Sequence, residues 1–239
     1  MLVLALDTAT PASTAALVEV TDDGLFGVVE QRTVDPRAHG EKLAPEIAAA
    51  LAEAGVRPRD LRAIVAGVGP GPFTGLRVGL ATAASMGQAL GIPTYGVCSL
   101  DALGRAAGPG RVLVATDARR REVYFATYVD GERVFGPEVA RPADVPAALA
   151  AAASTVVTSG ADHTTNHHAP DRACGEGALK YGDVFGLPVE EHLLYPPGAA
   201  LVAIAAPRIR DAAPSEVLTP LYLRRPDAVE PAGRKPVLT

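Results

Sequence analysis

The chain has 239 residues, of which 48% are hydrophobic and 21% charged, and its formal net charge is −5. This composition is typical of a globular protein with a full core, and the acidic balance argues against a chain that is the main binder of a nucleic acid. The two cysteines, Cys98 and Cys174, lie far apart in the sequence, so a structural disulfide is not expected and the chain reads as intracellular.

The N-terminus predicts neither a signal peptide nor a membrane anchor. Residues 1–6 are apolar but reach Asp7 without a basic leader, and no apolar run has the length of a membrane span. We therefore expect a cytoplasmic protein without membrane attachment.

The first residues predict the start of a sheet. An apolar strand over 2–6 ends in Asp7, and strands over 13–20 and 25–34 follow it. Residues 39–54 then predict a helix with apolar residues on one face. Three antiparallel strands with an aspartate at the end of the first are therefore expected to open the fold.

The next segment predicts a strand, a glycine loop and a helix. The strand covers 63–68, the loop contains Gly69 and Gly71, and Thr74 is the expected N-cap of a helix over 75–90. This arrangement can cradle a phosphate at the helix N-terminus. It matches neither common glycine-rich motif, so the alternative is a tight turn that packs the helix onto its strand.

The helix over 75–90 carries a stripe of small residues. Gly75, Gly79, Ala83 and Gly87 recur every four positions. A glycine inside a helix costs about 1 kcal/mol relative to alanine, so the stripe needs a reason. Either a helix of the same chain or a helix of a second protein approaches this stripe, and the sequence leaves both alternatives open.

A short strand over 94–97 completes a β-β-β-α-β-α-β order, which predicts a mixed sheet with helices on its faces. Ser99 is the expected cap of a helix over 100–107. We divide the chain into an N-terminal lobe over 1–107, a C-terminal lobe over 108–196 and a C-terminal helix with an extended tail over 197–239; within this last part the helix is predicted over 197–209.

The second lobe begins like the first. A strand over 111–116 ends in Asp117, as the first strand ends in Asp7, and a hairpin follows with strands over 122–128 and 132–135. This repetition indicates that one strand-led unit is duplicated.

The remainder of the second lobe predicts a helix over 142–153, a strand over 155–159 and a polar loop over 160–178. The loop contains His163 and His167, which have the spacing of a metal-binding pair on a helix, next to His168 and upstream of Cys174. The residues between the histidines are poor helix formers, so a solvated loop is the preferred interpretation, with fortuitous zinc binding as the alternative.

Strand-end carboxylates are the remaining candidates for chemistry. Asp7, Thr8 and Asp117 are candidates for a vestigial nucleotide site, because carboxylates at such positions of a two-lobed fold can hold a magnesium–nucleotide complex. Neither aspartate is followed by a glycine that would let a phosphate approach the backbone, which weakens this hypothesis. Residues 119–121 are three arginines, interpreted as a solvated turn in preference to an RNA contact.

Several segments together resemble the TsaB family of bacterial proteins for tRNA threonylcarbamoyladenosine synthesis. They are residues 1–10, 39–43, 67–83, 91–103 and 117–124, followed by 175–181 and 220–225. The resemblance implies an α/β fold of the actin/Hsp70/sugar-kinase-like (ASKHA) type, with two RNase H-like lobes whose mixed sheets are flanked by helices.

The resemblance also implies a non-catalytic role. Members of the family pair with a catalytic paralogue, TsaD, which transfers threonylcarbamoyl to adenosine 37 of ANN-decoding tRNAs, and an ATPase, TsaE, joins the complex. The chain would then meet tRNA only indirectly, and it would hold no cofactor of its own beyond weak ATP or ADP binding at the subunit complex. No metal site is expected, because the metal-binding His-x-x-x-His pair of the paralogue corresponds here to His39 and Leu43.

The helices over 39–54 and 75–90 are the implied partner surface, for TsaD or for a second copy of the chain. The expected interface residues are His39, Leu43, Ile47, Gly75, Gly79, Thr82, Ala83 and Met86, with Gly69, Gly71 and Thr74 in the adjoining loop. The alternative functions are a small-molecule phosphotransferase of the same fold, or a metallopeptidase.

Overall fold

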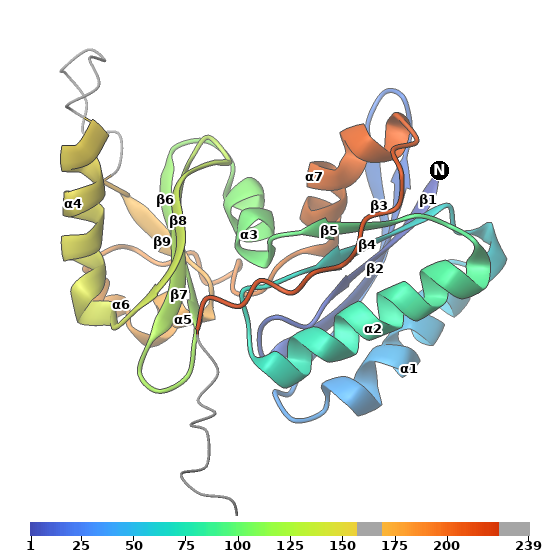
Figure 1. Ribbon diagram of the computed structural model, residues 1–239, viewed down its shortest axis with the longest axis horizontal. Helices are drawn as coiled ribbons and strands as arrows, with labels where there is room; N and C mark the ends of the chain where they lie inside the picture. The colour runs from blue at the N-terminus through green and yellow to red at the C-terminus, as the bar shows by residue number, and fades with distance from the viewer. Residues whose placement is uncertain (157–168, 225–239) are drawn as a thin grey trace, which may run out of the picture.

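The computed structural model describes residues 1–156 and 169–224, and its strands form two mixed sheets flanked by helices (Figure 1). The first sheet has five strands in the order β3-β2-β1-β4-β5, and the second has four in the order β8-β7-β6-β9. The predicted α/β architecture is confirmed. The two sheets share the spatial order of their first four strands, as the repeated sequence unit predicts.

The first sheet consists of β1 (Leu2–Asp7), β2 (Ala12–Val20), β3 (Leu25–Val34), β4 (Ala63–Gly67) and β5 (Thr94–Val97). Strand β1 pairs antiparallel with β2 and parallel with β4, and β4 pairs parallel with β5. The central strands β1 and β4 are buried on both faces, which explains why their sequences are continuous apolar runs without polar alternation.

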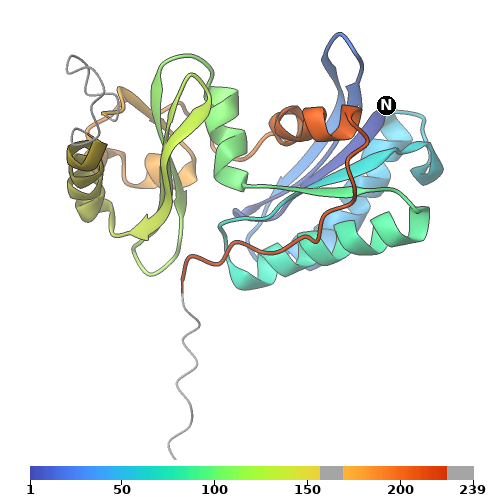
Figure 2. The same cartoon turned by 45° about the horizontal axis from the view of Figure 1, so that its top comes forward.

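Helices cover both faces of the first sheet. Helices α1 (His39–Glu53) and α2 (Phe73–Leu90) lie on one face, where they pack with Leu4 and Leu6 of β1. Helix α7 (Gly198–Arg210) comes from the far end of the chain and packs on the opposite face with the alternate residues of β1 (Figures 1 and 2). The first sheet with these three helices is called the first lobe.

The second sheet consists of β6 (Arg111–Asp117), β7 (Val123–Val129), β8 (Glu132–Ala140) and β9 (Arg172–Cys174), with β9 parallel to β6. Helix α4 (Val145–Val156) packs on its outer face. The short helices α5 (Glu176–Lys180) and α6 (Gly182–Phe185) complete the second lobe, and single 3-10 turns occur at Pro58–Asp60 (η1) and Pro142–Asp144 (η2).

Helix α3 (Ser99–Ala107) lies between the two lobes. Leu100 and Leu103 pack with Tyr128 of the second sheet, while the helix also contacts α7. A Cβ atom at Gly104 would lie 2.3 Å from the Tyr128 ring, so only glycine permits this close approach.

Several predicted boundaries differ from the structure. The predicted loop over 160–178 is wrong at β9 and α5, because Cys174 and Ala173 are apolar residues that complete the second core. The predicted strand over 155–159 is wrong at its start, where α4 continues to Val156; residues 157–159 lie outside the described residues. The division at residues 107 and 196 stays a prediction.

Both predicted helix caps are also wrong. Helix α2 begins at Phe73 with Pro72 in the cap position, and Thr74 is an exposed residue of the first turn that caps nothing. Ser99 is the first residue of α3, and its hydroxyl is committed to a partner in β1.

The described part of the C-terminal tail, residues 211–224, contains no helix or strand and runs along the first lobe toward the second (Figure 2). The Glu216 N–H donates to the Thr94 carbonyl at 2.8 Å, and the Leu221 N–H donates to the Val68 carbonyl at 2.8 Å. In the described ranges, no helix combines the length and hydropathy needed to cross a bilayer.

Candidate functional site

The Asp7 carboxylate at the end of β1 is closed off by the chain itself. It is 1% exposed, and it accepts hydrogen bonds from the Ser99 hydroxyl at 2.5 Å and from the Ala9 N–H at 3.0 Å. A Cβ at Gly67 would lie 1.8 Å from Asp7 Oδ2, so the β4 backbone covers the carboxylate. Burial raises the pKa of Asp7 to about 6, although both hydrogen bonds and the Arg32 charge act to lower it. Asp7 therefore links β1 to α3.

Thr8 fixes α2 against the turn after β1. Its hydroxyl donates to the Gly75 carbonyl at 2.7 Å, and the residue is 1% exposed. A Cβ at Gly75 would lie 2.6 Å from the Thr8 carbonyl oxygen, and one at Gly79 would lie 2.4 Å from Thr8 Oγ1. Both glycines are therefore needed for the helix to approach the turn this closely.

The glycine loop occupies the space in which a phosphate would approach the β1–β2 turn. A Cβ at Gly71 would lie 2.3 Å from the Ala9 carbonyl oxygen. Gly69 has a φ of +100°, and its carbonyl accepts the Ser99 N–H at 2.8 Å. The tight turn that packs α2 onto β4 accounts for these glycines, and the phosphate cradle is not formed.

Asp117, at the corresponding end of β6, also makes its polar contacts within the chain. Its side chain is 12% exposed, lies 3.1 Å from Lys180 Nζ, and accepts the Arg119 N–H at 3.2 Å. The Asp117 N–H in turn donates to Glu176 Oε1 at 3.0 Å. Asp117 therefore links β6 to α5 in the way that Asp7 links β1 to α3.

Glu176 is a buried carboxyl group that the sequence analysis did not single out. Its Oε2 atom has no hydrogen-bond partner among the described residues. Burial raises the pKa of Glu176 to about 7, although the backbone hydrogen bonds from Asp117 and from its own N–H act to lower it; the nearby charges of Asp117 and Asp7 act in the same direction as burial. The signal available in the sequence was a glutamate between two glycines, Gly175 and Gly177, at a helix start.

The small stripe of α2 is covered by the chain itself. Gly75 and Gly79 lie under Thr8, Ala83 is 0% exposed, and a Cβ at Gly87 would lie 2.5 Å from Thr94 Cγ2. The prediction that the stripe faces a second protein is therefore wrong. Packing within the chain explains it, with the β1–β2 turn, β5 and His39 of α1 as the close neighbours.

The expected interface residues of α1 are also inside the first lobe. Leu43 and Ile47 are 1% and 6% exposed and belong to the core beneath α1 and α2. Thr82 and Met86 of α2 are half-buried. The solvent-exposed outer face of α2 consists of Phe73, Thr74, Arg77, Ala81, Ala84, Ser85, Gln88 and Ala89.

His39 begins α1 and is buried next to α2. It is 7% exposed, and its Nδ1 has no hydrogen-bond partner in residues 1–156 and 169–224. Burial lowers the pKa of His39, the Arg119 charge lowers it further, and the Asp35 charge opposes both. His39 therefore contributes packing at Gly75 and lies within electrostatic reach of Arg119 of the second lobe.

The second histidine cluster lies outside the described residues, because His163, His167 and His168 all precede residue 169. Cys174 is fully buried, and burial raises the pKa of its thiol. Within the described part of the chain, no group of three or more His, Cys, Asp or Glu side chains could hold a metal ion.

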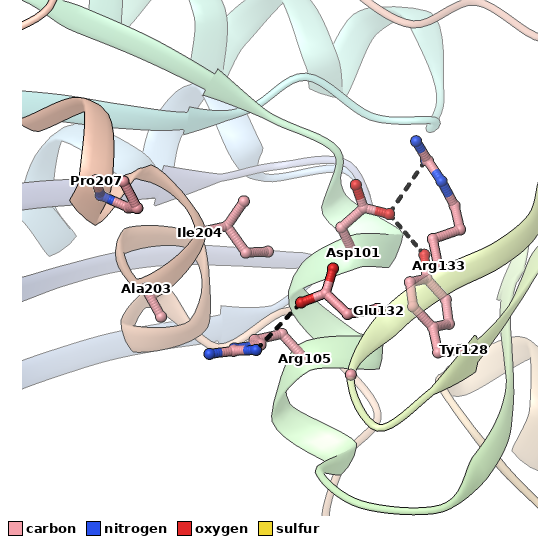
Figure 3. A pocket seen from close by; sticks show the side chains of 9 residues that line it. Asp101, Arg105, Tyr128, Glu132, Arg133, Ala203, Ile204 and Pro207 are labelled. Atoms are coloured by element: carbon pink, nitrogen blue, oxygen red, sulfur yellow. Dashed lines mark hydrogen bonds and ion pairs between the residues drawn. The ribbon is translucent and has the colours of Figure 1, made fainter.

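A polar cavity of about 450 Å³ lies between α3, α7 and the β7–β8 hairpin (Figure 3). Asp101 Oδ1 accepts the Tyr128 hydroxyl at 2.8 Å and lies 3.1 Å from Arg133 Nη1. Arg105 pairs with Glu132 at 3.4 Å. The charged side chains that line the cavity pair with one another. These ion pairs join α3 to the β7–β8 hairpin.

Comparison with known proteins places the chain in a family. The sequence profile described as "TsaD: tRNA N6-adenosine threonylcarbamoyltransferase" matches residues 27–228. An uncharacterised Mycobacterium tuberculosis protein is 48% identical over 95% of this chain and 93% of its own length. Escherichia coli TsaB, a tRNA threonylcarbamoyladenosine biosynthesis protein, is 37% identical over about half of each protein, 54% of this chain and 55% of the relative.

Solved structures agree with this assignment. YeaZ from Pseudomonas aeruginosa is 27% identical, covers 93% of this chain and 99% of its own, and has a TM-score of 0.67. A second Pseudomonas aeruginosa structure, described as similar to the peptidase YeaZ, has 28% identity and a TM-score of 0.69. These likenesses confirm the predicted ASKHA-type fold. The chain therefore belongs to the TsaD family of tRNA N6-adenosine threonylcarbamoyltransferases, as a TsaB/YeaZ-like member.

Proposed function

We propose that the chain is a non-catalytic subunit in the synthesis of threonylcarbamoyladenosine on tRNA, and that it activates a TsaD-family catalytic partner. The observation that carries the proposal is the closed end of β1. Asp7 is held by Ser99, and the space above Ala9 is filled by Gly71. A member of the transferase family in which the turn after β1 is filled by its own glycine loop fits a supporting role better than a catalytic one.

The outer face of α2 is the proposed docking surface for the partner. It presents small side chains, Ala81, Ala84, Ser85 and Ala89, over about two and a half turns of helix. Small side chains let a partner helix approach closely, and they lose little side-chain entropy on binding. TsaE and tRNA would join through this complex, in the cytoplasm, and a second copy of the chain could use the same face in the absence of the partner.

Reconstitution tests the role. The TsaD-family counterpart from the same organism, with its ATPase and an ANN-decoding tRNA, should form threonylcarbamoyladenosine efficiently only when this chain is added. Ala84→Arg should abolish co-elution with the counterpart and remove the stimulation, because it places a long cation on the docking face. Ala147→Arg, at an exposed alanine of α4, is the matched control and should behave like the wild type.

Equal product formation with and without the chain would overturn the proposed role. Unchanged co-elution of the Ala84→Arg variant would remove only the docking face.

A phosphotransferase remains the second candidate because Asp7 and Asp117 end equivalent strands of the two lobes. Calorimetry with Mg-ATP decides between the two functions: the closed turn predicts little or no heat at millimolar nucleotide, and clear binding would favour the phosphotransferase. For the metallopeptidase alternative, metal analysis of protein purified without chelators is the corresponding test.

A further inference from the structure

The cavity between α3, α7 and the β7–β8 hairpin has a charged wall and an apolar wall (Figure 3). The charged wall carries two ion pairs, Asp101 with Arg133 and Arg105 with Glu132. The apolar wall consists of three residues of α7, which are Ala203, Ile204 and Pro207. The volume of about 450 Å³ lies within the range of about 300–1,000 Å³ that is usual for small-molecule pockets. The cavity therefore has room for a small ligand and offers it a different chemistry on each side.

The two ion pairs use only part of the hydrogen-bonding capacity of the charged wall. Arg133 Nη1 lies 3.1 Å from Asp101 Oδ1, and Arg105 Nη1 lies 3.4 Å from Glu132 Oε1. A guanidinium group has five N–H donors, and a carboxylate has two acceptor oxygens. Each pair therefore leaves donors and acceptors of both charge signs for a ligand.

The apolar wall also contains a backbone acceptor. Pro207 lies inside α7 and has no N–H, so it cannot donate to the carbonyl of Ala203, four residues earlier in the helix. Both residues line the cavity. A carbonyl without its usual helical donor thus lies in a wall whose side chains are apolar.

The charged wall is held in place by the tip of the β7–β8 hairpin. The Asp130 N–H donates to the Gly110 carbonyl at 2.9 Å, and the Gly110 N–H donates to Asp130 Oδ1 at 2.8 Å. A Cβ at Gly131 would lie 3.5 Å from Arg105 Cα, so the hairpin tip packs directly on α3. A wall that is already ordered lowers the entropic cost of binding a ligand.

The chemistry of the walls excludes several classes of ligand. The two arginines and two acids of the charged wall have no net charge, so a phosphate would face two carboxylates and a polyamine would face two guanidinium groups. Tyr128 is 1% exposed and offers no free ring on which a nucleobase could stack. A small zwitterion with an apolar body matches both walls.

We propose that this cavity binds a free α-amino acid with an aliphatic side chain. Its carboxylate pairs with the guanidinium of Arg105, its ammonium group donates to Asp101 and to the Ala203 carbonyl, and its side chain packs on Ile204. An amino-acid site goes beyond the proposed function and does not rest on it, because neither docking nor tRNA modification assigns a ligand to this cavity.

Isothermal titration calorimetry of the full chain with L-leucine tests the site. A saturable heat with a Kd of about 1 mM or tighter is expected for a ligand of this size. Glycine should bind at least about tenfold more weakly because it has no side chain to bury. 4-Methylpentanoate, which has no ammonium group, and 3-methylbutylamine, which has no carboxylate, should each bind at least about tenfold more weakly, because each leaves part of the charged wall without a partner.

Two variants locate the site. Arg105→Gln should weaken L-leucine binding about tenfold or more, while Arg141→Gln makes the same charge change at an exposed arginine of the second lobe and should bind like the wild type. Ala203→Leu should abolish measurable binding because its side chain fills part of the cavity. Ala147→Leu, at an exposed alanine of α4, is its matched control. Thermal unfolding of each variant verifies that it is folded.

Hydrogen exchange provides a second measurement that does not depend on a variant. Saturating L-leucine should slow amide exchange in α3 and in the β7–β8 hairpin and leave α1 unchanged. The amino-acid site would be overturned by the absence of saturable heat with L-leucine, by equal affinities of the Arg105→Gln and Arg141→Gln variants, or by protection confined to elements outside the cavity. Equal affinities for L-leucine and 4-methylpentanoate would equally overturn it, because the ammonium group would then have no role.

Discussion

Asp7 and Glu176 illustrate how single residues are used in this molecule. Both are buried carboxyl groups, and burial raises the pKa of each toward neutrality. A group of this kind usually suggests acid–base catalysis. Here the hydrogen bonds run to Ser99 and to the Asp117 N–H, so the two carboxyl groups connect strands to helices.

Asp7→Asn is expected to stabilise the protein at neutral pH. The pKa of Asp7 is about 6 in the folded chain against an ordinary value of 3.8, so the folded state binds more protons between these values. The Asp7 contribution therefore favours folding at low pH and is lost as the pH rises from about 4 to about 6. The variant, whose amide can still bond Ser99 and Ala9, should gain about 1–3 kcal/mol in unfolding free energy at pH 7.5.

Urea unfolding of both proteins from pH 4 to pH 8 checks this, and the difference between them should shrink toward pH 4. A difference that is independent of pH would contradict the prediction.

At the scale of elements, α2 shows how a small-residue stripe can be required by a turn. The helix approaches the turn after β1 so closely that Thr8 occupies the space that Cβ atoms at Gly75 and Gly79 would need. The same glycines therefore fix the position of the outer face of α2, which is the part of the helix that a partner can reach.

Gly79→Ala is expected to lower the unfolding free energy by roughly 1–3 kcal/mol or more, because its Cβ would lie 2.4 Å from Thr8 Oγ1 in a packed interior. Gly40→Ala is the matched control within α1, since a Cβ there meets nothing within 4 Å, and it should stabilise by up to about 1 kcal/mol. Thermal unfolding of both variants measures the contrast. Similar melting temperatures for the two would show that α2 is not pressed against the turn.

At the scale of the whole molecule, the chain closes on itself through its C-terminal part. Helix α7 returns to the first sheet, and the tail then crosses back toward the second lobe. Glu216 anchors the tail, with one oxygen 2.6 Å from Arg208 Nη1 and the other accepting the Gly96 N–H at 3.0 Å. The tail thus protects the free edge of β5, which would otherwise be open to pairing with another strand.

Glu216→Ala should release the tail from β5 without unfolding the lobes. Amide hydrogen exchange at residues 94–97 should become faster, by roughly tenfold if one charge-assisted bond of about 1.5 kcal/mol is lost. Exchange in the second sheet should not change. Glu191→Ala, at an exposed glutamate of the second lobe, is the control, and equal protection of β5 in both variants would contradict the anchoring role of Glu216.

Local sequence patterns were sufficient to predict most of the helices and strands. Apolar runs and the turns between them predicted the strands of the first sheet, the helices α1 and α7, and the repeat of a strand that ends in aspartate. These elements could be predicted because the pattern of a buried strand or an amphipathic helix depends on residues that are close in the sequence. The same local signals misplaced β9 and α5, whose short segments are stabilised by the core that they complete and not by their own sequence.

What the sequence determined by itself is the α/β class, the duplicated opening of each lobe and the segments by which the chain resembles its family. Only the tertiary structure decided why α2 contains glycines, because a missing side chain does not say which neighbour occupies its place. For Gly75 and Gly79 that neighbour is Thr8, and for Gly87 it is Thr94. It also decided that Asp7 and Asp117 are structural and that Glu176 is buried within reach of both charges. These contacts join residues distant in the sequence, and such distances become fixed only when the core packs.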